Sequence, residues 1–279
     1  MQRRLVMVTN DDSVQSRGIA QLAEAVSKYA DVIVVAPDAP QSATALSLTF
    51  HKPLRVAKVN MGKTECFAVS GSPGDCVMIG VNKLLPRRPD LIVSGVNAGD
   101  NNSYQDVFAS GTVAAALEAA ITGIPAIAFS MQLLDEEMAS FELEKIDFSR
   151  AAYVAAEIAR DVLENGMPEG AELLNVNFPS KMDARSQIVL TQLARRKYTD
   201  GVLVRKDPHG RNYYWLFGER LPQFQANTDA EAVLVHRRVS ITPLSLNMSG
   251  PITAGLKGLR ERVQERIAKS RPHEPRLAK

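Results

Sequence analysis

Residues 5–12 read Leu-Val-Met-Val-Thr-Asn-Asp-Asp, an apolar strand pattern that runs directly into three oxygen-bearing side chains. In an open α/β sheet, ligands bind just beyond the carboxyl ends of the strands. Two adjacent carboxylates at such an edge, Asp11 and Asp12, are costly unless a positive charge neutralises them. A divalent cation such as Mg²⁺ or Mn²⁺ prefers these oxygen ligands, so the stretch predicts a metal site. The alternative is that Asn10, Asp11 and Asp12 only cap the helix that begins near Gly18.

The composition is typical of one large α/β domain, or of one domain with a sizeable appendage. The chain has 279 residues, of which 45% are apolar and 23% charged, so it can bury a substantial core. No apolar run reaches the ~18 residues that a membrane span needs. Residues 1–4 lead into the first strand without a signal-peptide pattern, and Cys66 and Cys76 are typical of structural thiols. These features predict a cytoplasmic protein with no membrane partner.

The net charge is only +2, but the charges are unevenly distributed along the chain. Residues 131–180 carry eleven acidic and three basic side chains, whereas residues 181–220 carry nine basic and four acidic ones. A basic segment of this kind suits an anionic ligand. No DNA-binding or RNA-binding motif accompanies it, so we expect no nucleic-acid polymer as a partner.

The first 130 residues alternate strand and helix patterns. Repeated β-α units predict a mostly parallel, Rossmann-like sheet with right-handed crossovers and flanking helices. The expected strands are 5–9, 32–36, 53–59, 65–69, 91–93 and 126–130, and the expected helices are 18–29, 73–83 and 112–122. The Gly- and Asn-rich stretch 95–109 is predicted to be a loop. A helix at 148–165 and a strand at 173–178 continue the pattern, so residues 1–180 are expected to form the catalytic core.

Residues 181–279 are predicted to form an extension of this core. Residues 186–217 alternate β-branched, aromatic and basic side chains between turn signals, which predicts antiparallel hairpins. Residues 236–246 are expected to return a strand to the core. A charged amphipathic helix follows at 254–270, with apolar residues at spacings of three or four positions. Its apolar stripe could pack on its own domain or on another subunit.

Four polar loops are expected to meet at the carboxyl edge of the predicted sheet. Asp11 and Asp12 bring two negative charges, while Ser42 and Asn97 bring neutral oxygens, a donor set that suits a hard divalent cation. The start of the Ala-rich helix, Ser110-Gly111-Thr112, offers backbone N–H groups to an anion. Each loop alone is typical of an ordinary turn or cap. Together they indicate a phosphate clamp, although the chain has neither a Walker loop nor a dinucleotide fingerprint.

Several motifs along the chain occur in a characteristic order. They are Thr9-Asn-Asp-Asp, Ala36-Pro-Asp with Gln41-Ser42, Ser94-Gly-Val-Asn-Ala-Gly, Ser110-Gly-Thr-Val, Asn175-Val-Asn-Phe-Pro, Asp229 and Val239-Ser-Ile-Thr-Pro-Leu. In these motifs the chain resembles the SurE-type survival-protein nucleotidases from about Arg3 to Leu244. The resemblance implies a metal-dependent phosphatase that acts on nucleoside monophosphates. It also implies that Asp11, Asp12, Ser42 and Asn97 are the metal ligands, and that Ser110, Gly111 and Thr112 face the phosphate.

Two positions depart from the family pattern. The family usually has Gly after the Asp pair, where this chain has Ser13, and an aromatic residue commonly precedes the Ser-Gly-Thr motif, where this chain has Ala109.

Two further candidate site residues, Asn10 and Asn101, each have a structural alternative. Asn10 could stabilise charge on the transferring phosphoryl group, and Asn101 could reach phosphate or ribose, but each is also typical of a turn or loop.

The leading hypothesis is a phosphomonoesterase that hydrolyses nucleoside 5′-monophosphates, with 3′-monophosphates as a second substrate class. It would use one Mg²⁺ or Mn²⁺ per subunit, with Asp11, Asp12 and Asn10 as candidate catalytic residues. The alternatives are a non-catalytic nucleotide-binding or sensing module, and a phosphatase that prefers polyphosphate or other phosphoesters. Members of the family exchange C-terminal elements between subunits, so the resemblance implies a homodimer or homotetramer that is assembled through the hairpin and terminal helix.

Overall fold

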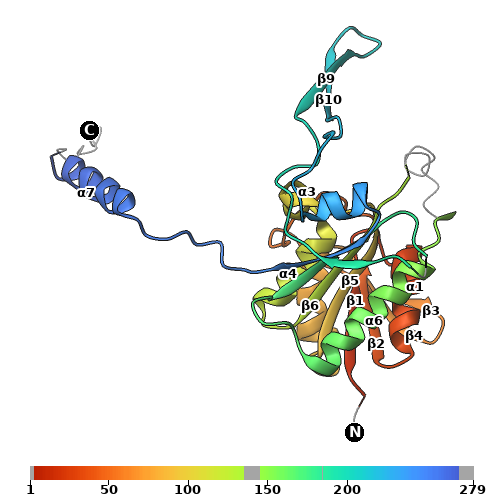
Figure 1. Ribbon diagram of the computed structural model, residues 1–279. Helices are drawn as coiled ribbons and strands as arrows, with labels where there is room; N and C mark the ends of the chain where they lie inside the picture. Colours follow the sequence, from red (N-terminus) through yellow and green to blue (C-terminus); the bar gives the residue numbers. More distant parts are fainter. Residues whose placement is uncertain (1–2, 135–144, 184, 270–279) are drawn as a thin grey trace. The chain divides into compact units, whose positions relative to one another are not determined.

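The computed structural model in Figure 1 describes residues 3–134, 145–183 and 185–269. The chain divides into two compact units, Met1–Leu246 and Asn247–Lys279. The larger unit holds the sheet and the helices that flank it, and the smaller unit holds helix α7 (Ala254–Lys269). Residues 135–144, which belong to the acidic stretch 131–180, lie outside the described residues.

A nine-stranded sheet forms the larger unit, in the order β3-β4-β2-β1-β5-β6-β7-β11-β8. Its strands are β1 (Leu5–Thr9), β2 (Asp31–Pro37), β3 (Val56–Met61), β4 (Thr64–Val69), β5 (Leu91–Ala98), β6 (Ala126–Met131), β7 (Leu173–Phe178), β8 (Ile188–Leu190) and β11 (Val239–Leu244). Neighbours from β4 to β7 run parallel, while β3 is antiparallel to β4 and β11 is antiparallel to β7. The predicted mostly parallel α/β fold is therefore confirmed.

Helices cover both faces of this sheet (Figure 1). The main helices are α1 (Arg17–Ser27), α2 (Pro73–Ile79), α3 (Ser103–Ala109), α4 (Gly111–Ile121) and α6 (Ser149–Asn165), with π-helical turns η1 (Gly80–Leu84) and η3 (Glu231–Val235). Helices α1 and α6 contribute to one buried hydrophobic cluster, and α2 and α4 contribute to a second. Because each cluster also contains side chains of the central strands, the sheet is buried on both faces, as parallel sheets are.

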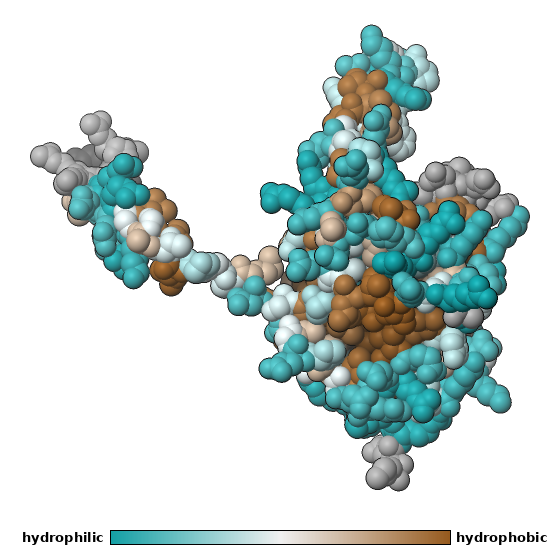
Figure 2. All heavy atoms as spheres, viewed as in Figure 1, coloured by the Kyte–Doolittle hydropathy of each residue, from teal (hydrophilic) through white to brown (hydrophobic). Residues whose placement is uncertain are grey.

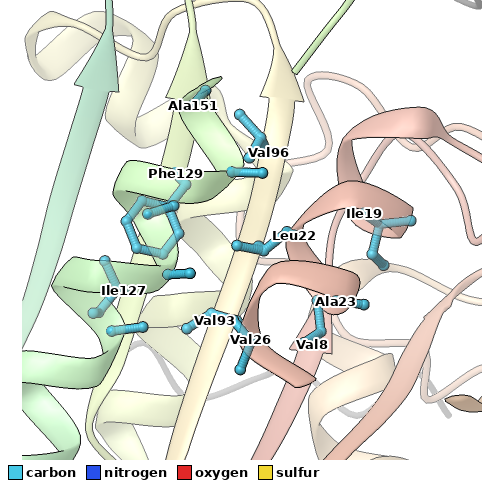
Figure 3. Close-up of a cluster of buried hydrophobic side chains, with 14 of the residues drawn as sticks. Val8, Ile19, Leu22, Ala23, Val26, Val93, Val96, Ile127, Phe129 and Ala151 are labelled. Carbon is cyan, nitrogen blue, oxygen red and sulfur yellow. The ribbon is translucent and has the colours of Figure 1, made fainter. Parts of the chain in front are cut away.

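Helix α1 anchors the first strand. Figure 3 shows Leu22 and Val26 of α1 beside Val8 of β1 and Val93 of β5, and all four side chains are fully buried. Burial of aliphatic side chains of this size stabilises a protein by about 1.5–3 kcal/mol each. The carboxyl end of β1, where the two aspartates follow, is therefore held on a rigid part of the core.

The predicted hairpin region 186–217 divides into two parts. Strand β8 joins the main sheet beside β11 and runs parallel to it. Strands β9 (Gly201–Lys206) and β10 (Asn212–Phe217) pair with each other as a separate antiparallel hairpin, most of whose side chains are exposed. The predicted antiparallel hairpin is therefore confirmed for β9 and β10. The prediction is wrong for β8, which pairs in parallel with β11, because a strand of three residues is too short for its pattern to identify its partner.

The stretch 95–109, which the sequence predicts to be a loop, is partly regular in the structure. Strand β5 continues to Ala98, and the seven residues Ser103–Ala109 form helix α3. The Ser103 N–H donates to Oδ2 of Asp229 (2.8 Å), and the Tyr104 N–H donates to the Ala194 carbonyl oxygen (2.9 Å). Because these partners lie far along the chain, tertiary contacts override the local propensity of this stretch.

The two cysteines are free and buried, as the sequence predicts for structural thiols. Burial raises the pKa of the Cys66 thiol to about 11, and burial also raises the pKa of Cys76 above its ordinary value. Thiols of this kind remain protonated and unreactive near neutral pH. Among the helices that the structure describes, none is both long enough and apolar enough to cross a membrane.

Candidate active site

The four polar loops predicted from the sequence meet at the carboxyl edge of the sheet. The loop after β2 is tied to the loop after β1, because the Gln41 N–H donates to the Asp11 carbonyl oxygen (2.7 Å). It is also tied to the start of α4, because the Ala45 N–H donates to the Ala109 carbonyl oxygen (3.0 Å). The end of β5, from which the next loop begins, joins the group because the Ala98 N–H donates to Oδ2 of Asp12 (3.0 Å). The structure therefore brings the four loops together around the aspartate pair.

Asp11 lies against the N-terminus of α4. It is 4% exposed, and the Thr112 hydroxyl donates to its Oδ1. Burial raises the pKa of the Asp11 carboxyl, while bonds from Thr112 and from the N–H groups at the helix start oppose that rise. The positive end of the α4 dipole thus favours the charged form of the Asp11 carboxylate and opposes the effect of burial.

Gly111 permits this close approach. A methyl group at Gly111 would lie 2.8 Å from the Asp11 Cβ and 2.9 Å from Oδ2. Carbon atoms cannot approach so closely, so any larger residue would move Asp11 or the helix start. The packing of Asp11 against the start of α4 is therefore by itself a reason for glycine at this position, in addition to any close approach of an anion.

Asp12 is half-buried beside Asp11. The Ala98 N–H donates to its Oδ2 (3.0 Å), which orients one oxygen toward the loop after β5. Burial, with a further contribution from the negative charge of Asp11, raises the pKa of Asp12 to about 6. Among the described residues, neither Asp11 nor Asp12 forms an ion pair with a basic side chain. Two adjacent carboxylates of this kind are typical of a cation site.

The remaining metal-ligand candidates are neutral oxygen donors. Ser42 is exposed on the loop after β2. The side-chain amide of Asn97 donates to the Gly99 carbonyl oxygen (2.7 Å), which leaves its own oxygen for a ligand. Within the described residues, no three His, Cys, Asp or Glu side chains are grouped as a metal cluster. The donor set therefore fits a hard cation with water in its remaining positions better than a zinc ion.

Asn10 is fully buried and holds the turn that follows β1. Its side-chain amide donates to the Ser13 carbonyl oxygen (2.9 Å) and to the hydroxyl of Ser16 (2.7 Å), the residue that caps α1. Its Oδ1 has no hydrogen-bond partner in the structure. Ser13 has φ 94°, a backbone conformation that glycine adopts without strain. This explains physically why Gly suits the position after the Asp pair. The charge-stabilising role of Asn10 stays a prediction.

The predicted phosphate-binding segment has partners inside the protein. The Ser110 hydroxyl accepts a bond from the Val113 N–H (3.1 Å) as the N-cap of α4, and the Thr112 hydroxyl is engaged by Asp11. Capping of this kind stabilises a helix by about 1 kcal/mol. The side chains thus orient the helix start toward Asp11, and their contact with phosphate stays a prediction.

Asn101 lies on the loop between β5 and α3, over the ends of β6 and β7. Its backbone N–H donates to Oδ1 of Asn177 (2.7 Å), and its side-chain amide donates to the Ser130 hydroxyl (2.7 Å). The Asn175 amide donates to the Asn101 carbonyl oxygen (2.9 Å). Asn101 is therefore held by a buried polar network, which leaves its role toward phosphate or ribose a prediction.

Sequence reasoning missed part of this network. The alternation of Asn175 and Asn177 along β7 places both side chains on one face, and this spacing is a signal that could have been used. Lys197, by contrast, is buried beside Asp100 and Asp106, although it ends a run of three basic residues that reads as a solvated surface. No local pattern distinguishes it from its neighbours.

A cavity of about 430 Å³ opens beside Asp12. It is lined by residues of the β1–α1 turn, the loop after β2, β5 and the start of α6, among them Asp12, Gln15, Asp38, Ala98 and Phe148. Its volume lies within the range of small-molecule sites. Asp12 therefore borders a space that a small ligand can enter.

Comparisons with known proteins identify relatives of the chain. The family described as Survival protein SurE matches residues 6–200. The chain is 43% identical over 247 residues to a protein named 5′-nucleotidase SurE from Methanocella arvoryzae, covering 88% of this chain and 92% of that one. It is 41% identical to the protein of the same name from Thermofilum pendens, covering 95% and 99%. The crystal structure of the SurE protein from Aquifex aeolicus has a TM-score of 0.78 at 35% identity, covering 92% and 99%.

Proposed function

The chain belongs to the survival protein SurE family, and we infer from this membership that it is a 5′-nucleotidase, which hydrolyses nucleoside monophosphates to nucleoside and phosphate. The observation that carries the location of the reaction is the Asp11–Asp12 pair at the start of α4. The two carboxylates are adjacent, largely buried and free of basic partners among the described residues. The cavity beside Asp12 has room for a nucleoside.

The family implies that the activity depends on a divalent metal, and the donor set at this edge fits one. We assign one Mg²⁺ or Mn²⁺ per subunit to Asp11, Asp12, Ser42 and Asn97. When bound, such a cation polarises a phosphoryl oxygen and lowers the pKa of a bound water. Oxygen donors, with no Cys or His among them, support these hard cations over softer ones.

The residues of the chain supply orientation and charge. Thr112 and the start of α4 hold Asp11, and Ala98 holds Asp12, so the carboxylates need little rearrangement during the reaction. The N–H groups at the start of α4, with Ser110, Gly111 and Thr112, hold the remaining phosphoryl oxygens. We assign to Asn10 the stabilisation of charge on the phosphoryl group, through its unpartnered Oδ1, and to Asn101 a contact with phosphate or ribose.

Hydrolysis proceeds by direct attack of water. The Oδ1 of Asp11 already accepts the Thr112 hydroxyl, and its Cβ is packed against Gly111, which leaves the side chain little freedom to become a nucleophile. Asp11 is instead suited to accept a proton from the attacking water. Trapping of a phospho-enzyme by rapid quench would contradict this mechanism.

The test of the function is phosphate release from a substrate panel by the purified chain. The panel contains AMP, GMP, 3′-AMP, ADP and tripolyphosphate, each with Mg²⁺, with Mn²⁺ and with excess chelator. We expect metal-dependent release from 5′-monophosphates, with 3′-monophosphates as the second substrate class. Binding of AMP without turnover under every condition would favour the sensing module. Faster release from tripolyphosphate than from any nucleotide would favour the polyphosphatase alternative.

Metal addition is expected to raise the thermal unfolding temperature, and to raise it more at pH 8 than at pH 5. The folded-state pKa of Asp12, about 6, lies above its ordinary value of 3.8. The stability from this group in the metal-free protein is therefore complete below pH 3.8 and is lost as the pH rises through 6. A cation binds the deprotonated form, and at 100 times its Kd it contributes about 2.7 kcal/mol. Thermal unfolding with and without Mn²⁺ measures this, and an equal shift in Asp12→Asn would contradict the site.

The chain assembles into a homodimer or homotetramer through its C-terminal elements. Figure 2 shows apolar side chains on the surface of the larger unit, of the β9–β10 hairpin and of α7. On α7 and the residues before it, the exposed apolar side chains are Ile252, Leu256, Leu259, Val263 and Ile267. Exposed apolar stripes of this kind are typical of interaction surfaces. The free, buried cysteines support a cytoplasmic location for this assembly.

Deletion from Pro251 onward is expected to lower the oligomeric mass in solution. The deletion removes the apolar stripe, whose burial between subunits stabilises the assembly by roughly 25 cal/mol per Å² of apolar surface. Light scattering at micromolar concentration measures the mass, and phosphate release from AMP measures the retained activity. Since all proposed ligands precede residue 113, the truncated protein should keep some activity. A full-length protein that is strictly monomeric would contradict the exchange of C-terminal elements.

A further inference from the structure

Lys197 is a buried lysine with two carboxylate partners. Its side chain is 5% exposed, and its Nζ lies 2.7 Å from Oδ2 of Asp100 and 2.6 Å from Oδ2 of Asp106. It also donates to the Asp100 carbonyl oxygen (3.3 Å). Lysine is rarely buried unless it is paired, because removal of an ammonium group from water is costly. The pair of short contacts therefore indicates a specific role for this side chain.

The two carboxylates belong to the segment that leads into the active site. Asp100 lies on the loop between β5 and α3, and Asp106 lies within α3. Burial alone would lower the pKa of Lys197, but Asp100 and Asp106 raise it above its ordinary value, so the group remains charged. Burial raises the pKa of Asp106 to about 6, against the attraction of Lys197. Without the ammonium group, these two acidic side chains would face each other in a poorly solvated space.

The segment from Gly99 to Ser103 has positive φ angles at both ends, and the backbone is strained at Ser103, the first residue of α3. Gly99 has φ 132°, and Ser103 has φ 87°, which is unfavourable for a residue with a side chain. The Ser103 N–H donates to Oδ2 of Asp229 (2.8 Å). The other oxygen of Asp229 accepts bonds from the Ala194 and Ala230 N–H groups (2.8 Å each). Lys197 and Asp229 both lie beyond the predicted core of residues 1–180. Lys197 holds this segment at Asp100, and Asp229 holds it at Ser103.

This loop connects two parts of the proposed site. It begins two residues after Asn97, a proposed metal ligand, and it carries Asn101. Helix α3 follows it and ends at Ala109, directly before the Ser110-Gly111-Thr112 helix start. A displacement of Asp100 or of α3 would therefore be transmitted to Asn97 on one side and to the start of α4 on the other. Displacements of about 1 Å can reduce a reaction rate ~10²-fold.

We propose that Lys197 is a positioning residue that holds the β5–α3 loop and α3 in the geometry that the active site requires, through its ion pairs with Asp100 and Asp106. The proposal rests on the proposed nucleotidase function for its kinetic part. Its structural part, the ordering of residues 99–103, does not depend on any activity. Asp229 supports the same loop from its other end.

The test compares Lys197→Met with Lys197→Arg and with a matched surface variant, Lys58→Met. Lys58 also forms an ion pair at 2.8 Å, with Glu65, but both side chains are exposed. We expect Lys197→Met to lower kcat/KM for AMP ~10²-fold. We expect Lys197→Arg to recover most of this loss because it keeps the charge, and Lys58→Met to match the wild-type protein.

Amide hydrogen exchange distinguishes positioning from general stability. We expect the Asn101 and Ser103 amides, which donate to Asn177 and Asp229, to exchange at least ~10-fold faster in Lys197→Met, while the amides of β1 stay protected. Equal acceleration in β1, or unchanged exchange and kcat/KM, would overturn the proposal. If the wild-type protein releases no phosphate, the nucleotidase function fails, but the exchange measurement still decides whether Lys197 orders the loop.

A second variant covers the case in which Lys197→Met does not fold. The double variant combines Lys197→Met with Asp106→Asn. It removes the negative charge of Asp106 together with the positive charge of Lys197, so only the charge of Asp100 remains without a cation. We expect this double variant to fold and still to show fast exchange at Asn101, because Asp100 has lost its cationic partner and, among the described residues, keeps only the bond from the Asn102 amide. Normal protection of Asn101 in the double variant would overturn the proposal.

Discussion

Asp11→Asn and Asp12→Asn are each expected to lower kcat for AMP hydrolysis ~10³-fold or more, with the fold intact. Each substitution keeps the size of the side chain and one oxygen acceptor, so the Thr112 hydroxyl and the Ala98 N–H keep their partners. What is lost is the negative charge that a divalent cation needs. Asp11→Asn also removes the group suited to accept a proton from water.

Thermal unfolding and a matched control variant show whether the loss of activity is specific to these two carboxylates. Burial raises the pKa of both carboxyls, so a neutral amide should not destabilise the metal-free protein near neutral pH. Thermal unfolding without metal is expected to be unchanged or slightly higher in temperature. Asp161→Asn, an exposed site on α6, is the control and should retain full activity. More than about a tenth of wild-type activity in Asp11→Asn or Asp12→Asn would count against the metal assignment.

Gly111→Ala is expected to reduce kcat/KM for AMP ~10²-fold while α4 remains helical. The new methyl group would lie 2.8 Å from the Asp11 Cβ and 2.9 Å from Oδ2, so either Asp11 or the start of α4 must move. Both are parts of the proposed site, and the hydrogen bond between Thr112 and Asp11 links them. Overpacking of this kind also costs about 1–3 kcal/mol of stability, which thermal unfolding measures.

Gly255→Ala is the matched control for this variant, because it adds the same methyl group near the start of α7. The nearest atom there is the Thr253 hydroxyl oxygen at 3.7 Å, which is ordinary contact. Alanine has the higher helix propensity, so activity and stability should be equal to or slightly above those of the wild-type protein. If Gly111→Ala behaves like Gly255→Ala, the close packing of Asp11 on α4 has no catalytic importance.

The order of strands and helices in the core follows from local patterns in the sequence. The apolar run Leu5–Thr9 is fully buried on both faces, as continuous hydrophobicity predicts for a parallel strand. Helix α4 ends at Ile121 and is followed by Gly123, whose φ of 75° is the left-handed conformation that its position after the Ala-rich run predicts. These signals are readable because each depends on residues only a few positions apart.

The chemistry at the sheet edge is also readable in part. Parallel strands place their carboxyl ends at one edge of the sheet. The β-α alternation therefore predicts that the oxygen-rich loops after β1, β2 and β5 are neighbours. The helix start at Ser110-Gly111-Thr112 follows the same logic. The partner of Thr112, however, is Asp11, 101 residues earlier in the chain, and no local feature of either residue predicts that contact.

The sequence by itself therefore determined the succession of strands and helices along the core, the polar edge and the adjacent aspartates, whereas the spatial order of the strands came from the structure. The tertiary structure alone decided that α3 replaces a predicted loop and that Lys197 is buried against Asp100, 97 residues away. The physical reason is the range of the interactions. Hydrophobic periodicity and capping act within a few residues, whereas a buried ion pair is stabilised only when distant segments have already excluded water from both partners.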